Sequence, residues 1–87
     1  MKGRRVYHGE PHRFEPGDYG QDAISGIWYA RPPGDNKHLL ANLDRHKITV
    51  HEDATITVSP SIENTYPAGS ESEYWHGFLE RGIWRTA

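Results

Sequence analysis

The chain has 87 residues, which is room for one hydrophobic core, so we expect a single domain of modest stability. Its net charge of −2, counted with neutral histidines, argues against a protein that grips extended DNA or RNA through a general basic field. Because it has no cysteine, disulfides, thiolate zinc sites and cysteine nucleophiles are excluded. Nine glycines and six prolines favour many turns and short strands over long helices.

No apolar run approaches the ~20 residues that a membrane-spanning helix needs, and residues 1–5 lead into no apolar signal region. We therefore expect a cytoplasmic protein without a membrane partner. A small basic cluster near the N-terminus is interpreted as part of a solvated arm: Lys2, Arg4, Arg5 and Arg13.

Residues 1–25 show no hydrophobic period of 2 or 3.6, because glycine and proline recur through them. We expect an irregular N-terminal arm with at most one edge strand, held to the rest of the chain by Tyr7, Phe14 and Tyr19. The remaining residues, 26–87, are expected to form one β-rich domain.

Residues 26–31 are a strand candidate, because Ile27, Trp28 and Tyr29 combine β-branched and aromatic side chains. Two consecutive prolines then turn the chain. Residues 38–43 are rich in leucine and alanine, which favours helix. Six residues between two turns would form a marginal helix, however, so we favour a return strand.

Residues 47–58 predict a β-hairpin. Apolar and polar residues alternate on both sides of a turn at 52–54, as expected when one face of the hairpin lies on a core. Pro60 is expected to end the second strand, because it has no N–H for a central ladder. A polar loop should follow at 64–73.

Residues 74–86 predict a second hairpin around 80–82, with Gly82 in the left-handed position of a three-residue loop with a bulge. Residues 75, 77 and 79 share one face of its first strand, and residues 74, 76 and 78 share the other. Both faces are bulky, so the hairpin is either covered on both sides or exposes an aromatic ledge. The expected fold class is all-β or β-rich α+β, a small antiparallel sheet of two or three hairpins with the irregular arm.

A resemblance rests on segments 26–30, 40–43, 51–53, 56–62 and 75–79, together with His46, Gly82 and Trp84. Over these residues the chain resembles a group of small uncharacterised proteins of tailed phages and prophages. The resemblance implies a phage or prophage origin and implies no activity. More distant relatives place a cysteine-rich, metal-binding type of turn upstream, and since this chain has no cysteine there, a zinc role does not carry over.

Metal binding is one hypothesis, because six histidines are many for this length. The candidate ligands are His46, His51, Asp53 and His76, which would converge if the two hairpins paired. Three such ligands and a water would suit zinc or another divalent ion. The chain has no HExxH motif and no paired short spacing, so we favour ordinary surface histidines and expect no cofactor.

A serine hydrolase is a second hypothesis, in which Ser59 or Ser61 would act with His76 and a carboxylate. Neither serine lies in a glycine elbow, so we interpret the Ser-Pro-Ser run as a strand terminator. The glycine-rich phosphate loops of nucleotide-binding folds are absent from the sequence.

The C-terminal hairpin is the candidate binding face, because aromatic rings can stack on bases and arginines can pair with phosphate. The candidate ligand-binding residues are Tyr74, Trp84, His76, Arg81, Arg85, Ser59 and Ser61. For Trp84 and Tyr74, a place in the hydrophobic core is an equal alternative.

The favoured hypothesis is a small phage-encoded binding protein without catalytic activity, an accessory or anti-host-defence factor in the host cytoplasm. It would sequester a host protein or a nucleotide-like small molecule, and the sequence does not choose between these partners. Formation of a homo-oligomer would extend the buried surface. The alternatives are a small metal-dependent enzyme that uses the His/Asp cluster and a minor structural protein of the virion.

Overall fold

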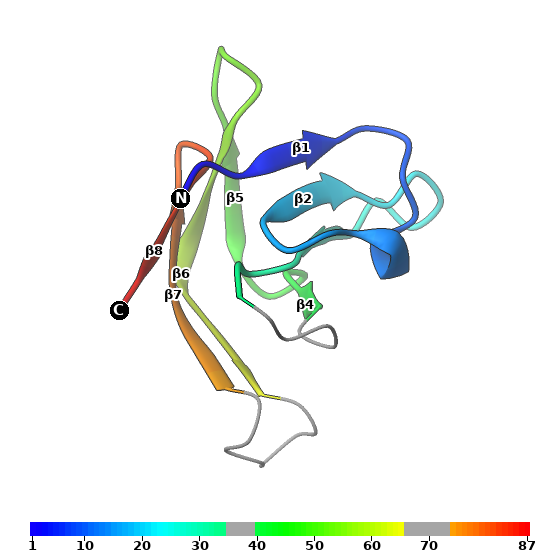
Figure 1. Ribbon diagram of the computed structural model, residues 1–87. Helices are drawn as coiled ribbons and strands as arrows, with labels where there is room; N and C mark the ends of the chain where they lie inside the picture. The colour runs from blue at the N-terminus through cyan, green and yellow to red at the C-terminus, as the bar shows by residue number, and fades with distance from the viewer. Residues whose placement is uncertain (35–39, 66–73) are drawn as a thin grey trace.

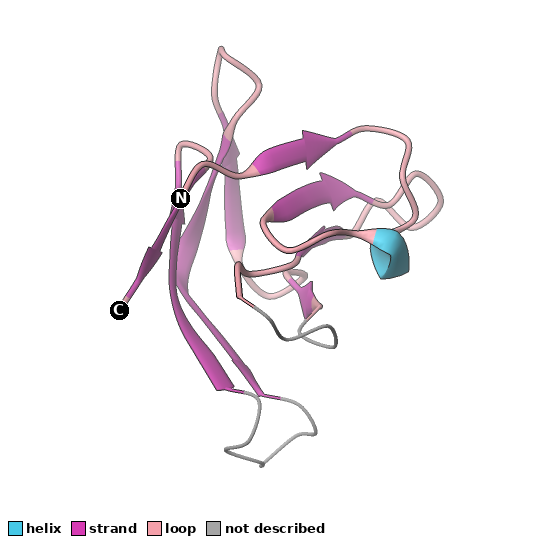
Figure 2. Ribbon diagram, viewed as in Figure 1, coloured by secondary structure: helices cyan, strands magenta, loops and turns pink. Residues whose placement is uncertain are grey.

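The computed structural model describes residues 1–34, 40–65 and 74–87, with the backbone alone described for Asn64, Thr65 and Tyr74. These residues form two four-stranded sheets (Figures 1 and 2), so the expected β-rich fold class is confirmed. The one helical element among them is a turn of 3-10 helix, η1 (Pro11–Arg13). No helix in the described residues is long and apolar enough to cross a membrane.

The first sheet contains, in spatial order, β1 (Arg4–Val6), β2 (Asp18–Gln21), β3 (Trp28–Ala30) and β4 (Ala41–Asn42). Strand β1 runs parallel to β2, and the other neighbours are antiparallel. A parallel pair cannot be joined by a tight hairpin, so the chain makes a longer connection from β1 to β2, through η1.

Residues 1–25 differ from the irregular arm that the sequence predicts. They contain both β1 and β2, and β2 lies in the interior of the first sheet. Phe14 and Tyr19 are buried, whereas Tyr7 is 55% exposed. The two strands have three and four residues, which is too short for a hydrophobic period to emerge between the glycines and prolines.

The strand expected at 26–31 is present as β3, and the return strand expected at 38–43 is present as β4. Tyr29 pairs with Asn42 and Ala30 with Ala41, in antiparallel register. Residues 38 and 39 of the expected return strand lie outside the described residues.

The second sheet contains β5 (Lys47–Val50), β6 (Ile56–Thr65), β7 (Tyr74–Glu80) and β8 (Ile83–Thr86), each antiparallel to the next. The hairpin predicted at 47–58 is confirmed as β5–β6, and its turn projects beyond the neighbouring strands (Figure 1). Ile56 and Val58 are buried, whereas Val50, next to the turn, is 52% exposed. Most of the polar loop expected at 64–73 lies outside the described residues.

The prediction that Pro60 ends the strand is wrong. Strand β6 continues through a cis Ser59–Pro60 peptide bond as far as Thr65. Val58 pairs with Leu79 and Ile62 with Gly77, so β6 advances four residues while β7 advances two. Pro60 lies in this bulge on the side of β7. On the side of β5, the last paired residue of β6 is Ser59, so Pro60 lies beyond that ladder. The missing N–H of Pro60 therefore interrupts neither ladder.

The turn between β7 and β8 is shorter than predicted. Glu80 pairs with Ile83, which leaves a two-residue loop of Arg81 and Gly82 in place of the expected three-residue loop with a bulge. Both loop residues have positive φ, 47° for Arg81 and 74° for Gly82. Positive φ at both positions is typical of two-residue hairpin loops whose backbone twist matches that of the flanking strands. Glycine adopts this conformation freely, whereas Arg81 adopts it against the preference of its side chain.

Trp84 joins the two sheets. Its side chain is buried, and its ring meets that of Trp75 edge to face, with centroids 5.4 Å apart and planes at 87°. The indole Nε1–H donates to the carbonyl of Gly17, 2.9 Å away and just before β2. The core around them draws on both sheets and on the segment between them: Tyr19, Ala30, Ala41, Leu43, Ile56, Val58, Ile62 and Leu79.

Residues 1–3 form a short strap along β8. Met1 and Trp84 exchange two backbone hydrogen bonds, of 3.0 and 2.7 Å, and Gly3 N–H donates to the Gly82 carbonyl at 2.7 Å. Lys2 faces Ile83 in an antiparallel bridge. Strand β1 follows directly, so the chain passes from the edge of the second sheet into the first.

We expect Trp84→Ala to lower the free energy of unfolding by about 3–5 kcal/mol, because it empties a large volume at the contact between the sheets. Trp84→Phe keeps a ring but leaves the Gly17 carbonyl without the indole donor, so a loss of about 1–3 kcal/mol is expected. Urea unfolding followed by circular dichroism measures both. The control is Ile83→Ala on the same strand, where the side chain is 47% exposed and a loss below about 1 kcal/mol is expected. A Trp84→Phe variant as stable as this control would contradict a stabilising hydrogen bond from Trp84 to the Gly17 carbonyl.

Candidate functional site

The residues predicted for a C-terminal ledge do not lie on one surface. Trp84 is 3% exposed and packs in the core, so its ring has no free face for stacking. Arg81 lies on the β7–β8 turn, and Ser59 is exposed beside the bulge. The side chain of Tyr74 lies outside the described part of the structure.

Three of the predicted residues do come together on the face of the second sheet that points away from the core. Ser61 Oγ lies 3.0 Å from His76 Nε2. Arg85 lies over the ring of Phe78, 4.4 Å from its centroid, and forms an ion pair with Glu80 at 2.7 Å. We call this surface, formed by Ser61, His76, Phe78, Glu80 and Arg85, the outer band. The charge of its arginine is already paired with Glu80 within the hairpin.

The Ser61–His76 hydrogen bond matches part of the hydrolase hypothesis. A hydrolase would also need donors for an oxyanion and a cavity for its substrate. Neither Ser61 nor His76 lines the hollow at residues 5–8 and 21–26 or the groove between the N-terminal residues and the two turns. The hydrogen bond lies beside the β6 bulge, where it links neighbouring strands, and we assign it no chemistry.

Each of the four candidate metal ligands has a polar contact of its own. His46 Nε2 lies 3.3 Å from the Ser61 carbonyl, and His51 Nε2 is hydrogen-bonded to Thr57 Oγ1 at 2.6 Å. Asp53 accepts hydrogen bonds from Thr55. Across residues 1–34, 40–65 and 74–87, no group of three or more His, Cys, Asp or Glu side chains could hold a metal ion.

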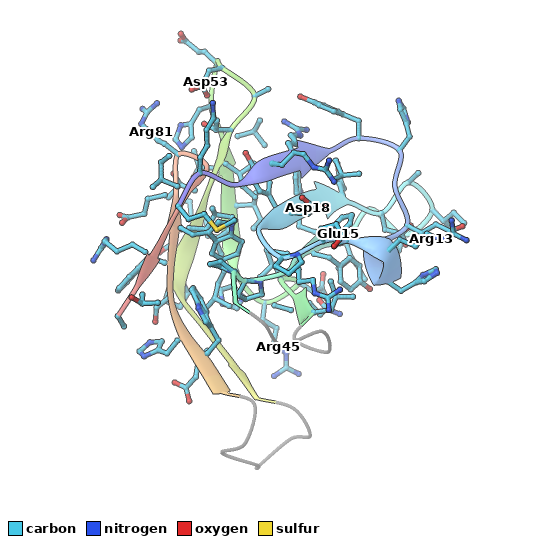
Figure 3. The ribbon with its side chains drawn as sticks, viewed as in Figure 1. Arg13, Glu15, Asp18, Arg45, Asp53 and Arg81 are labelled. Atoms are coloured by element: carbon cyan, nitrogen blue, oxygen red, sulfur yellow. The ribbon has the colours of Figure 1, made fainter. Side chains whose placement is uncertain are left out.

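A groove that the sequence did not predict lies where the N-terminal strap, the β5–β6 turn and the β7–β8 turn meet. We call it the basic groove. Its volume is about 590 Å³, and its lining includes Lys2, Arg5, Tyr19, Asp53, Thr55 and Arg81. Figure 3 shows Arg81 and Asp53 at this end of the molecule, on the two neighbouring turns. The basic residues near the N-terminus were a visible signal, but nothing in the sequence placed them beside Arg81.

The basic groove carries an excess of positive charge. Arg4 also lines it, but Arg4 is neutralised by Asp18, whose carboxylate accepts from Arg4 Nε at 3.0 Å and Nη2 at 2.8 Å. This hydrogen bond and charge raise the pKa of Arg4. Lys2, Arg5 and Arg81 form no ion pair with any residue that the structure describes, and Asp53 is the one carboxylate among the lining side chains.

Arg5 is held in place by groups that leave its charge unpaired. Its Nη1 donates to the Ala54 carbonyl at 2.7 Å, which ties β1 to the β5–β6 turn. Its guanidinium lies 4.5 Å from the ring centroid of Tyr7 and 5.1 Å from that of Trp28, within the range of cation–π attraction. A positioned guanidinium with free N–H groups is a suitable partner for phosphate or carboxylate.

Tyr19 contributes a hydroxyl to the floor of the basic groove. Most of the residue is buried, and its hydroxyl, which reaches the groove beside Gly82, has no hydrogen-bond partner among the described residues. Burial raises the pKa of Tyr19, and the positive charge of Arg5 opposes part of this rise. The hydroxyl is therefore protonated at neutral pH and can donate to a bound anion.

Asp53 is held on the rim by its own turn. Its Oδ1 accepts from the Thr55 hydroxyl at 2.6 Å and from the Thr55 N–H at 3.1 Å. These hydrogen bonds lower the pKa of Asp53, with a smaller contribution from the charge of Arg81. Asp53 is therefore ionised at neutral pH, and its single negative charge offsets only one of the three neighbouring cations.

Comparison of the chain with family models, curated proteins and solved structures gives no match.

We expect Thr55→Val to raise the pKa of Asp53 toward the usual value for a carboxyl, because the variant removes the stronger of its two hydrogen bonds. NMR titration of the side-chain carboxyls measures this directly. Since the folded-state pKa of Asp53 is lowered, its contribution to stability is complete above the unfolded pKa and disappears as the pH falls through the folded value. The matched control is Ser25→Ala, which should raise the pKa of Asp22 alone. Equal titration of Asp53 in the wild type and Thr55→Val would contradict the contact.

Proposed function

We propose that this protein is a non-enzymatic binding protein that holds a small, phosphate-bearing molecule in the basic groove. The observation that carries the proposal is that one groove is lined by three cations without ion-pair partners among the described residues, beside a tyrosine hydroxyl that can donate to a ligand. Positive groups that converge on one groove without paired carboxylates favour an anionic ligand.

The size of the positive region favours a small ligand. The whole chain has a net charge of −2, so the attraction is local to the groove and does not extend along a surface that could follow a nucleic-acid backbone. Arginine and phosphate match in geometry as well as in charge, because the guanidinium can donate two parallel hydrogen bonds.

The groove is better suited to binding than to catalysis. Thr55 and Asp53 are hydrogen-bonded like a nucleophile and its base, but a carboxylate whose pKa is lowered is a poor acceptor of protons at neutral pH. Tyr19 has the opposite shift and stays protonated. Neither group is therefore tuned for general-base chemistry, whereas both can position a ligand.

Capture of one ligand by one protein needs affinity and no turnover. The resemblance to tailed-phage proteins supports a setting in which a phage-encoded factor removes a phosphorylated signal of its host. A host protein is the alternative partner. A stable complex with a protein would bury a larger surface of this chain than the basic groove offers.

We expect inorganic pyrophosphate to bind with a stoichiometry of one, and Arg81→Gln to weaken this binding about 10- to 100-fold, since a hydrogen bond to a charged group contributes about 1.5–3 kcal/mol. Lys2→Gln should act in the same direction with a smaller effect, because an ammonium makes a less specific contact. Isothermal titration calorimetry measures the affinities, and the affinity of the wild type should decrease with added salt.

The matched control is Arg85→Gln, which removes the same charge from the same hairpin but at the outer band, where Arg85 is paired with Glu80. Its affinity for pyrophosphate should stay within about twofold of the wild type. Equal losses in Arg81→Gln and Arg85→Gln would reduce the effect to net charge, and an absence of pyrophosphate binding by the wild type would overturn the proposal.

A further inference from the structure

A second hollow adjoins the basic groove. We call it the side hollow; its volume is about 330 Å³, and it is lined by Arg5, Tyr7, His8, Gln21, Asp22 and Gly26, among others. Arg5 and Tyr7 line both spaces, so they form a shared wall between them. A ligand longer than a phosphate group could therefore contact Arg5 from the groove and continue past Tyr7.

The two spaces differ in chemistry. The basic groove offers cations and the Tyr19 hydroxyl, which are donors. The side hollow offers acceptors. Gln21 Nε2 donates to the Gly26 carbonyl at 2.8 Å, which fixes the amide and leaves its own carbonyl oxygen to accept from a ligand.

Asp22 is the second acceptor of the side hollow. Its carboxylate accepts from the Ser25 hydroxyl at 2.7 Å, and this hydrogen bond lowers the pKa of Asp22. An ionised carboxylate and an amide carbonyl at one site suit hydroxyl and amino groups, whereas they would repel a second phosphate. The side hollow is therefore complementary to a neutral, donor-bearing part of a ligand.

Tyr7 supplies an aromatic face at the junction. It is 55% exposed although it is a large aromatic residue, and its ring is oriented by the guanidinium of Arg5. Aromatic rings beside arginines are the usual platform for stacking of a nucleobase. The junction thus joins a phosphate-binding arginine to a stacking ring without an intervening element.

We propose that the ligand is a nucleoside phosphate, with its phosphates in the basic groove and its nucleoside in the side hollow across Tyr7. This inference rests on the proposed function, because it extends the same site. It assigns three roles: Arg5 spans the phosphate and nucleoside parts, Tyr7 stacks on the base, and Gln21 and Asp22 accept from hydroxyl or amino groups.

The test compares inorganic pyrophosphate with the diphosphates of adenosine, guanosine, cytidine and uridine by isothermal titration calorimetry on the full chain. At least one nucleoside diphosphate should bind about tenfold more tightly than pyrophosphate, because stacking of one base on an aromatic ring increases the affinity by about this factor. Tyr7→Leu should abolish that preference, measured as the ratio of the nucleoside diphosphate affinity to the pyrophosphate affinity of the same variant, because leucine has no aromatic face. Gln21→Ala should also reduce the preference, because it removes the amide oxygen that accepts a hydrogen bond from the nucleoside.

The matched control is Ile24→Ala, whose side chain is 97% exposed on the same loop and lines neither space; it should leave both affinities unchanged. If pyrophosphate binds and no nucleoside diphosphate binds more tightly, the nucleoside inference is overturned and the proposed function stands. If nothing binds, or if Arg81→Gln changes nothing, both are overturned. A nucleoside preference that survives in Tyr7→Leu would also overturn the assignment.

Discussion

The contact on which the structure depends is the seating of Trp84 between the two sheets. Its ring packs edge to face on Trp75 within the second sheet, and its indole N–H donates to Gly17, which leads into the first. Each sheet has only four strands and needs a partner layer to bury one of its faces. A chain of 87 residues has little core to spare, so one tryptophan that serves both sheets replaces a separate core for each.

The basic groove is a consequence of the packing of Trp84 between the two sheets. The Gly17 carbonyl accepts both from Trp84 and from the N–H of Arg4, so the start of β1 is fixed by the same atom that fixes the tryptophan. The strap at residues 1–3 then follows β8 to Gly82 and brings Lys2 beside the β7–β8 turn. Cations that are far apart in sequence meet because the strap leads from the edge of the second sheet directly into β1 of the first.

The sequence predicted the parts of the fold that repeat a pattern and missed the parts that depend on distant partners. The β5–β6 hairpin was predictable because Ile56 and Val58 alternate with polar residues over a sufficient length. Strands β1 and β2 were not, since three or four residues carry no period. Pro60 was misread because a bulge, which depends on pairing with β7, removed the ladder position that proline disrupts. Of the predicted site residues, Arg81 and Asp53 line the groove, Asp53 having been proposed as a metal ligand, whereas Lys2 and Arg5 were interpreted as part of a solvated arm.

The opposed shifts of Tyr19 and Asp53 give the basic groove a single charge state around neutrality. Guanidinium groups remain charged at every pH at which proteins fold, Tyr19 stays protonated, and Asp53 stays ionised. Neither Tyr19 nor Asp53 would therefore take up or release a proton on binding of the proposed anion. A terminal phosphate loses its second proton near pH 6, so any proton linked to binding between about pH 6 and 8 would belong to the ligand. The groove would then act as a discriminator of the ionisation state of its ligand, rather than as a sensor of the acidity around it.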